Sequence, residues 1–143
     1  MIRTAQAADI EKIVQLIQPY IKDFAIDSQG EDKFNAATIA QLLSMPTVEY
    51  FIFEQNKQLM GVIAYRQPAH LLHFFVDQQF QQQGTGRSMW QWLEHKIRLN
   101  SSIITVNSSC YAQPIYEKFG FHAISTAIEA QGLRYVPMQK LYP

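Results

Sequence analysis

The sequence predicts an α/β fold with a mixed β-sheet, and three patterns along the chain indicate it. Helical stripes of apolar residues separate runs of β-branched and aromatic residues. The early strand-like runs follow one another directly, whereas the later ones have helices between them. One apolar run leads through a glycine turn into a helix. Because 143 residues is close to the usual size of one domain, we expect a single domain over residues 1–143.

The composition is that of a packed globular protein, with 48% hydrophobic, 13% aromatic and 17% charged residues. Twelve basic side chains balance twelve acidic ones, so no net field attracts nucleic acid or an anionic membrane. The lone Cys110 has no partner for an internal disulfide, and neither a secretory signal nor an apolar run of about 20 residues is present. We therefore expect a cytoplasmic protein with a small-molecule or peptide partner, bound neither to nucleic acid nor to a membrane.

The first half of the chain is predicted to form two helices and then a hairpin. Apolar residues at i, i+3, i+4 and i+7 indicate the first helix, which we expect Pro19 to end. The acidic stretch Tyr20–Asp32 reads as irregular. Polar residues separate the two β-branched and aromatic runs of the hairpin. The helices are expected over Ala8–Ile17 and Phe34–Leu43, and the strands over Val48–Phe53 and Leu59–Tyr65.

The second half is predicted to alternate between strands and helices. Its first run, Leu71–Val76, is almost continuously apolar, which is typical of a strand buried on both faces. The following helix places four large apolar residues on one face, namely Met89, Trp90, Leu93 and Ile97. The remaining elements are a helix over Arg87–Leu99, a strand over Ile103–Val106, a helix over Ala112–Phe119 capped by Gly120, and a hairpin over Phe121–Met138 that turns near Gly132.

The segment Gln81–Gly86 joins the apolar strand to the helix that begins at Arg87. Unpaired backbone N–H groups at the positive end of a helix dipole bind phosphate, and glycine lets a diphosphate approach the main chain closely. The alternative is a tight turn that needs glycine only for its shape. The segment has no third glycine for a dinucleotide fingerprint and no Gly-Lys-Ser/Thr ending for a nucleotide P-loop.

The pattern Gln/Arg-x-x-Gly-x-Gly/Ala after a buried strand resembles the coenzyme A motif of the GCN5-related N-acetyltransferase (GNAT) superfamily. It occupies Leu71–Arg87. Downstream, Thr105–Ser109 followed by Tyr111–Phe121 is similar to the second coenzyme-contacting motif of that family. The predicted order of helices and strands over Ile2–Met138 also resembles that of the family. The resemblance implies the acyl-CoA N-acyltransferase type of fold, in which helices flank a mixed, mostly antiparallel central sheet that is splayed between its fourth and fifth strands.

The same resemblance implies acetyl-CoA as the cosubstrate and assigns residues to it. The backbone of Phe75 and Val76 is expected to bind the pantetheine arm and the acetyl carbonyl, and Asn107 to bind the arm from the neighbouring strand. Arg87 adds a positive charge to the backbone contacts. The residues expected around the diphosphate are Gln81, Gln82, Gln83, Gly84, Thr85, Gly86 and Arg87.

Two residues are candidates for proton transfer. Tyr116 matches the family position whose phenol protonates the departing sulfur. It also lies on an apolar helical face, so the alternative is a core tyrosine with a satisfied hydroxyl. His73 on the motif strand is our candidate base, since an unperturbed pKa of about 6.5 suits proton removal near neutrality. The alternative is a hydrogen-bonded core histidine. His70 would face the other side of a regular strand, and nothing predicts a metal site.

The predicted activity is an acetyl-CoA-dependent N-acetyltransferase that acetylates a primary amine of a small molecule or peptide. Attack is direct, in a ternary complex, so Cys110 is not needed as a nucleophile. One alternative is a catalytically inactive coenzyme A-binding sensor or interaction module of the same fold. Another is an ATP-binding domain, for which the usual lysine and metal-binding carboxylates are missing.

The amine acceptor is expected to meet an acidic loop. Its carboxylates would attract a cationic amine, unless they are simply solvated surface charges. Glu49 and Tyr135 are further candidates at the border of the cleft, and exposed strands near the C-terminus offer an edge for a homodimer. The acidic residues of the loop are Asp23, Asp27, Glu31 and Asp32.

Overall fold

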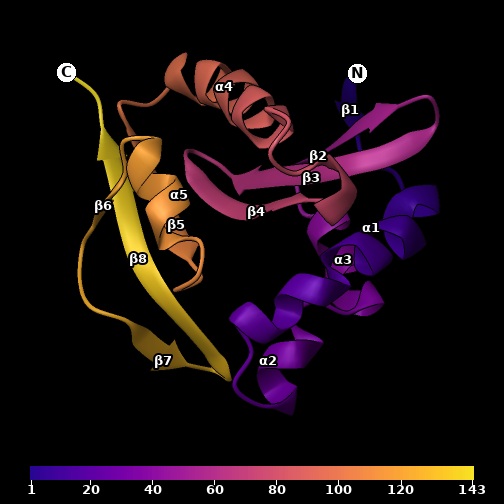
Figure 1. Ribbon diagram of the computed structural model, residues 1–143, viewed down its shortest axis with the longest axis horizontal. Helices are drawn as coiled ribbons and strands as arrows, with labels where there is room; N and C mark the ends of the chain where they lie inside the picture. Colours follow the sequence, from indigo (N-terminus) through magenta and orange to yellow (C-terminus); the bar gives the residue numbers. More distant parts are fainter.

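A twisted β-sheet runs through the computed structural model, which describes all residues from Met1 to Pro143 (Figure 1). The strands lie in the order β1-β2-β3-β4-β5-β8-β6, and β7 also pairs with β8. Only β4 and β5 are parallel, which confirms the mixed, mostly antiparallel sheet. The strands are β1 Ile2–Thr4, β2 Val48–Gln55, β3 Gln58–Arg66, β4 His70–Val76, β5 Ile103–Ser108, β6 His122–Ala123, β7 Ile128–Ala130 and β8 Leu133–Leu141.

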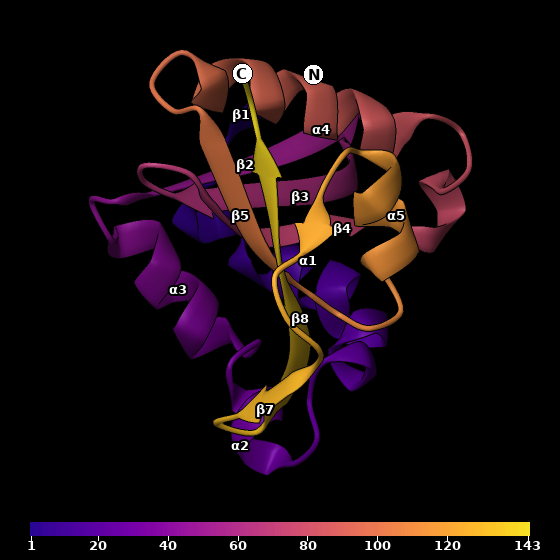
Figure 2. The same ribbon diagram turned by 90° about the vertical axis from the view of Figure 1, so that its left-hand side faces the viewer.

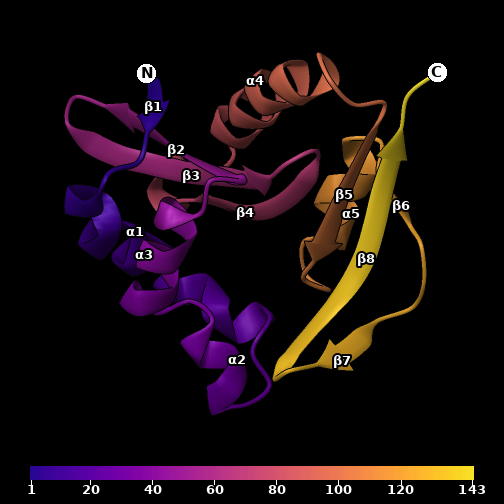
Figure 3. The same ribbon diagram turned by 180° about the vertical axis from the view of Figure 1, so that it is seen from behind.

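Helices cover both faces of the sheet (Figures 1 and 3). One hydrophobic core lies between the sheet and α4 and α5, and a second lies between the sheet and α1 and α3. No helix is both long and apolar enough to cross a membrane. The α-helices are α1 Ile10–Ile17, α2 Ser28–Asp32, α3 Ala36–Ser44, α4 Thr85–Arg98 and α5 Gln113–Lys118, and short 3-10 helices span Ala7–Asp9, Gln18–Asp23 and Gln78–Phe80.

The largest difference from the predicted elements is the acidic stretch Tyr20–Asp32, which is helical over most of its length. The α-helix α1 ends at Ile17 as predicted, but the chain continues as a 3-10 helix, which has Pro19 in its first turn, where a missing N–H costs nothing. Asp27 then begins α2 as its N-cap and accepts a hydrogen bond from the N–H of Gly30 at 3.1 Å. The prediction of an irregular loop was therefore wrong.

The predicted splay between β4 and β5 is confirmed. The two strands pair only at His70 with Thr105 and at Leu71 with Val106, after which β5 stays with β8. A β-bulge marks the same place: His73 lies opposite Ala64 but Leu71 lies opposite Tyr65, so Leu72 is an extra residue. The two halves of the sheet diverge beyond this bulge.

The expectation that β4 is buried on both faces holds only in part. His73 and Phe75 are buried on the α1 and α3 side. Phe74 and Val76 pack against the α4 core but remain partly exposed. Their partial exposure follows from the divergence of β5, which leaves this stretch of β4 without a neighbour on one side.

Main-chain bonds join the diverging halves again at their far end. Figure 2 shows β7 and the start of β8 beside α2. Ala25 forms an isolated β-bridge with Leu133, and the N–H of Ile26 donates to the carbonyl of Gly132 at 2.8 Å. Gly30 lies against this contact, where a Cβ would overlap the carbonyl oxygen of Gly132 and lie 2.7 Å from its carbonyl carbon. We call this contact between residues 24–30 and 132–134 the clasp.

We expect Gly30→Ala to destabilise the protein, because the added methyl group forces the two backbones of the clasp apart. Overpacking of this kind costs about 1–3 kcal/mol, which urea denaturation measures directly. Ser28→Ala in the same helix is the control. Ser28 is exposed, and its replacement should change the free energy of unfolding by less than about 0.5 kcal/mol. Equal stability of the two variants would contradict the role given to Gly30.

Candidate functional site

The glycine turn presents a row of backbone donors without acceptors. Gly84 is the N-cap of α4 with φ +84°, and no side chain caps the helix. None of the N–H groups from Gln82 to Arg87 has an acceptor within the protein; the next one, of Ser88, donates to the carbonyl of Gly84 at 3.0 Å. No acidic residue lies in the first turn of α4. Such a row at the positive end of a 14-residue helix favours an anion.

The space in front of the turn is open. A Cβ built on Gly84 would meet no atom within 4 Å, so a ligand can reach the main chain there. Gly86 instead rests on the end of β4, since its Cβ would lie 3.5 Å from a methyl group of Val76. Thr85 is buried, while Arg87 is exposed and forms no ion pair. Arg87 therefore adds a free positive charge beside the unpaired amides.

The glutamine side chains mostly brace the turn. The amide nitrogen of Gln81 donates to the hydroxyl of Tyr20 at 2.6 Å and to the carbonyl of Val76 at 3.1 Å. The Tyr20 hydroxyl itself donates to the Val76 carbonyl at 2.6 Å. Gln83 bonds to the carbonyl of Gln79 at 3.1 Å, and only Gln82 has a free, exposed side chain. Tyr20 was not among the predicted residues, because no sequence pattern links it to a turn 61 positions away.

The strand register determines which amides of β4 face the splay. The N–H of Asp77 donates to the carbonyl of Met60 on β3 at 2.8 Å. In an antiparallel pair the bonding direction alternates, so Phe75 also bonds toward β3. The N–H groups of Phe74 and Val76 point the other way, to the side that β5 has left. Of the two predicted backbone donors, Val76 thus faces the splay, and Phe74 takes the place expected for Phe75.

Tyr116 lies on α5 at the α4 side of this splayed region. Its ring contacts Phe74 edge to face at 6.3 Å between ring centroids and Phe121 at 5.5 Å. The residue is only 7% exposed. Its hydroxyl has no hydrogen-bond partner within the protein. Because no fully buried polar side-chain atom lacks a partner, this hydroxyl keeps some contact with solvent. Burial raises the pKa of the phenol.

Asn107 lies on β5 just beyond the last residue that pairs with β4. It is opposite Pro137 of β8, its side chain is exposed, and it has no hydrogen-bond partner within the protein. The next residues, Ser108 and Ser109, are buried and lead the chain into α5. Asn107 therefore borders the divergence from the side opposite Phe74 and Val76.

His73 has the surroundings of a core histidine. It is 7% exposed, its Nδ1 lies 2.9 Å from the hydroxyl of Tyr50, and its ring stacks on Phe34. Burial lowers its pKa to about 4, so it is a weak base. Its side chain also lies on the face of β4 opposite Phe74, which carries the contact with Tyr116. The structure thus brings Tyr116, Asn107 and the glycine turn to the splay but gives no support to His73 as the base.

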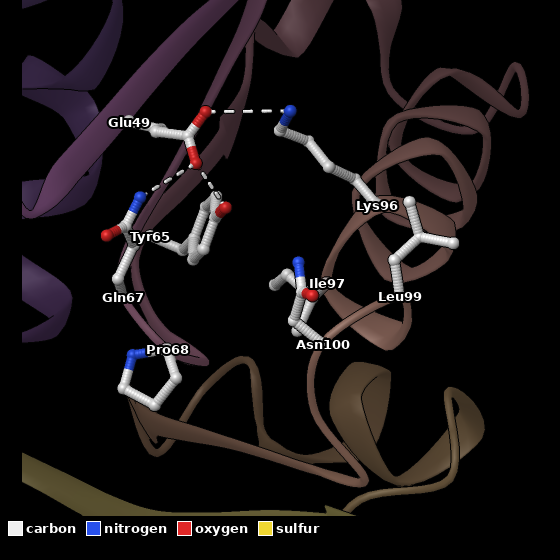
Figure 4. Close-up of a pocket in the computed structure, with 8 residues that line it drawn as sticks. All are labelled: Glu49, Tyr65, Gln67, Pro68, Lys96, Ile97, Leu99 and Asn100. Carbon is white, nitrogen blue, oxygen red and sulfur yellow. Dashed lines mark hydrogen bonds and ion pairs between the residues drawn. The ribbon is translucent and has the colours of Figure 1, made fainter.

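Three of the other acceptor-side candidates do not converge on the splay. Asp27 is used as the N-cap of α2, and Tyr135 lies in the β7–β8 hairpin opposite Ile128. Glu49 lines a cavity of about 380 Å³ at the C-terminal end of α4 (Figure 4). At 1.5 Å per residue this end is roughly 18 Å from the glycine turn.

The polar groups around this cavity already bond to one another. Glu49 accepts hydrogen bonds from the hydroxyl of Tyr65 and from Gln67 at 3.4 Å, and its other oxygen lies 3.5 Å from Nζ of Lys96 (Figure 4). Burial acts to raise the pKa of the Glu49 carboxyl, but these three partners outweigh it and hold the pKa below its usual value. The charged groups of the cavity are therefore already paired, and among its polar side chains Asn100 has no hydrogen-bond partner.

Comparisons with known proteins agree with this geometry. A model of the Acetyltransferase (GNAT) domain family matches residues 22–142. No curated relative matches the chain by sequence. Three solved structures share its fold: a GCN5-related N-acetyltransferase from Rhodopseudomonas palustris (TM-score 0.80, 20% identity, 99% of this chain and 94% of that chain), the PaiA N-acetyltransferase from Thermoplasma acidophilum in complex with coenzyme A (0.78, 15%, 99% and 98%), and the ribosomal-protein-S18-alanine N-acetyltransferase from Escherichia coli (0.73, 16%, 99% and 92%).

Structural likeness at such low identity establishes the fold, and the family assignment rests on the sequence model, which spans most of the chain. The two are consistent, since the splay of β4 from β5 and the open amides before α4 fall within the matched residues. The chain belongs to the GNAT family of acetyltransferases.

Proposed function

We propose that the protein is an acetyl-CoA-dependent N-acetyltransferase that acetylates a primary amine of a small molecule or peptide by direct attack in a ternary complex. The observation that carries this proposal is the row of unpaired N–H groups from Gln82 to Arg87 in front of a splayed strand pair. Coenzyme A is bound in two similar structures, the PaiA acetyltransferase and an aminoglycoside 6'-N-acetyltransferase. Both proteins are named as N-acetyltransferases, which fits the proposed reaction class.

The residues around the splay fit the separate parts of acetyl-CoA. The diphosphate would be held by the amides of Gln82–Arg87, with Arg87 adding charge. The pantetheine arm carries amide carbonyls, and the N–H groups of Phe74 and Val76 are placed to donate to such groups along the gap. Asn107 would bind the arm from β5. What acetyl-CoA supplies is an acetyl group activated as a thioester.

The chemistry then needs few protein groups. A neutral amine nitrogen bonds to the thioester carbonyl carbon, and the bond from that carbon to sulfur breaks. Backbone N–H groups of β4 stabilise the charge that develops on the carbonyl oxygen. Tyr116 donates its proton to the departing thiolate, and its raised pKa keeps the phenol protonated throughout the neutral range. No acyl-enzyme is required, and Cys110 is an exposed thiol outside this scheme.

A thiol-release assay, combined with acetyl-CoA binding and melting-temperature measurements, separates this proposal from its rivals. The protein is incubated with acetyl-CoA and spermidine, kanamycin, L-lysine or a peptide with a free N-terminal alanine, and free thiol is followed over time. Amine-dependent release of thiol is the expected result. Binding of acetyl-CoA without release with any amine would favour the sensor alternative. An equal rise in melting temperature with ATP and with acetyl-CoA would remove the coenzyme A assignment.

We expect Gly84→Val to weaken acetyl-CoA binding at least tenfold, because valine places a Cβ in the open space before the amides and disfavours φ +84°. Isothermal titration calorimetry measures the affinity. For the wild type, acetyl-CoA at about a hundred times its Kd should stabilise the fold by roughly 2.7 kcal/mol, and the variant should lose most of this gain. Gln91→Val, on the exposed face of α4, is the control and should keep wild-type affinity. Tight binding by a folded Gly84→Val protein would show that the motif is only a turn.

Tyr116→Phe separates the acid from the core interpretation, because the ring remains and only the hydroxyl is removed. If the phenol protonates the thiolate, kcat should fall by about 10² to 10⁴ where chemistry limits turnover, with little change in acetyl-CoA affinity. Melting temperature should also change little, since the hydroxyl has no hydrogen-bond partner to lose. Turnover within threefold of the wild type under those conditions would rule out Tyr116 as the acid.

A further inference from the structure

The bulge at Leu72 changes which histidines share a face of the sheet. In a regular strand, residues 70 and 73 point to opposite sides. Here Leu71 belongs to the α4 core, so His70 points to the α1 and α3 side, and the extra residue returns His73 to that same side. The expectation that His70 and His73 face apart was therefore wrong, because no bulge was foreseen.

His70 and His73 nevertheless differ in their surroundings. Nδ1 of His70 lies 2.7 Å from Oγ1 of Thr105, across the first of the two pairs between β4 and β5. The His70 side chain is only partly buried, and its Nε2 has no partner within the protein. His73 is enclosed by Phe34, Tyr50 and Phe75. Of the two rings, that of His70 is the more exposed, so its free nitrogen is the more accessible to a ligand.

His70 also lies at the closed end of the splay, where the reacting atoms are expected. An arm that starts at the glycine turn and follows the free edge of β4 must end before Leu71, at which β4 and β5 meet. The edge from Leu72 to Val76 is about 13 Å long at roughly 3.3 Å per residue. His70 stands immediately beyond its closed end, on the face of the sheet opposite Tyr116.

We propose that His70, oriented by Thr105, is the base that removes the proton from the acceptor ammonium, directly or through one water. This inference rests on the proposed acetyltransferase function. Donation of the Nδ1 proton to Oγ1 of Thr105 leaves a lone pair on Nε2. That lone pair takes one proton from the ammonium and passes it to solvent. The amine then forms its bond to the carbonyl carbon and the bond to sulfur breaks. Tyr116 gives its proton to the sulfur, and the second proton lost by nitrogen returns through solvent to the Tyr116 phenolate.

The charges around His70 define its titration. Burial lowers its pKa from 6.5, and the guanidinium of Arg66, its cross-strand neighbour on β3, lowers it further. On β5 its neighbour Thr105 does not titrate. The imidazole is therefore neutral and able to accept a proton at pH 7. Activity should fall on acidification, with a midpoint below pH 6.5, as His70 becomes protonated.

The decisive experiment compares His70→Asn with His73→Asn. Asparagine can keep the hydrogen bond made by Nδ1 but has no equivalent of Nε2. With acetyl-CoA and whichever of the four amines the wild type turns over fastest, His70→Asn should lower kcat by about 10² to 10⁴ and remove the acidic limb of the kcat profile. His73→Asn should lower the melting temperature and keep that limb. Acetyl-CoA affinity should stay within twofold in both variants.

Thr105 provides the test of orientation. Thr105→Val removes the hydrogen bond to His70 and should lower kcat by up to about 10², whereas Thr105→Ser restores the hydroxyl and should restore the rate. Proton NMR adds a readout that needs no acceptor: the C2 proton of His70 should titrate below pH 6.5, and that of His73 only near pH 4.

Three results would overturn the inference while leaving the acetyltransferase proposal in place. These are a His70→Asn enzyme within threefold of wild-type kcat with its acidic limb unchanged, loss of the limb in His73→Asn alone, or a C2 proton of His70 that does not titrate above pH 4. A wild-type protein that releases no thiol with any of the four amines would overturn the proposed function, and this inference with it.

Discussion

Beyond Leu71, the edge of β4 that faces β5 has no strand beside it, and backbone groups in that position cost free energy unless something bonds to them. The protein satisfies the carbonyl of Val76 twice, through the hydroxyl of Tyr20 and the amide of Gln81. The N–H groups of Phe74 and Val76 have no such partner. The splay therefore leaves these N–H groups free to bond to a ligand that carries acceptors. The unpaired amides before α4 continue the same row of donors toward an anion.

Where β4 and β5 do not pair, the two halves of the sheet could move apart, and two features oppose this movement. On the α4 side, the ring of Phe119 stacks on Phe74 of β4 and on Trp90 of α4, which holds α5 beside the splay. At the far end, the clasp joins Ala25 to Leu133 by main-chain bonds. The opening is thus bounded at both ends, by the β4–β5 pairs at one and by the clasp at the other.

The sequence predicted those parts of the site that depend on neighbours in the chain. The strand, glycine turn and helix were foreseen because a phosphate turn has a local signature, and the buried face of α4 because its period is local. The bulge at Leu72 was not foreseen, since one extra residue changes neither the composition nor the apolar pattern of the strand. The predicted face of His70 was wrong for this reason. The clasp could not be predicted for another reason. Gly30 and Gly132 come into contact only in the folded chain, and each alone has the sequence context of an ordinary loop glycine.

The proton donor and the proposed base gain their properties from one physical effect. Burial disfavours the charged form of any group, so it raises the pKa of a phenol and lowers the pKa of an imidazole. Tyr116, on the α4 side, accordingly keeps its proton at neutral pH, and His70, on the opposite side, is accordingly free of a second one. Both groups are therefore neutral before the reaction and ready for transfer in opposite directions. Because the sheet is open between β4 and β5, a single carbonyl in the gap can be approached by the amine from the His70 side while its sulfur faces Tyr116.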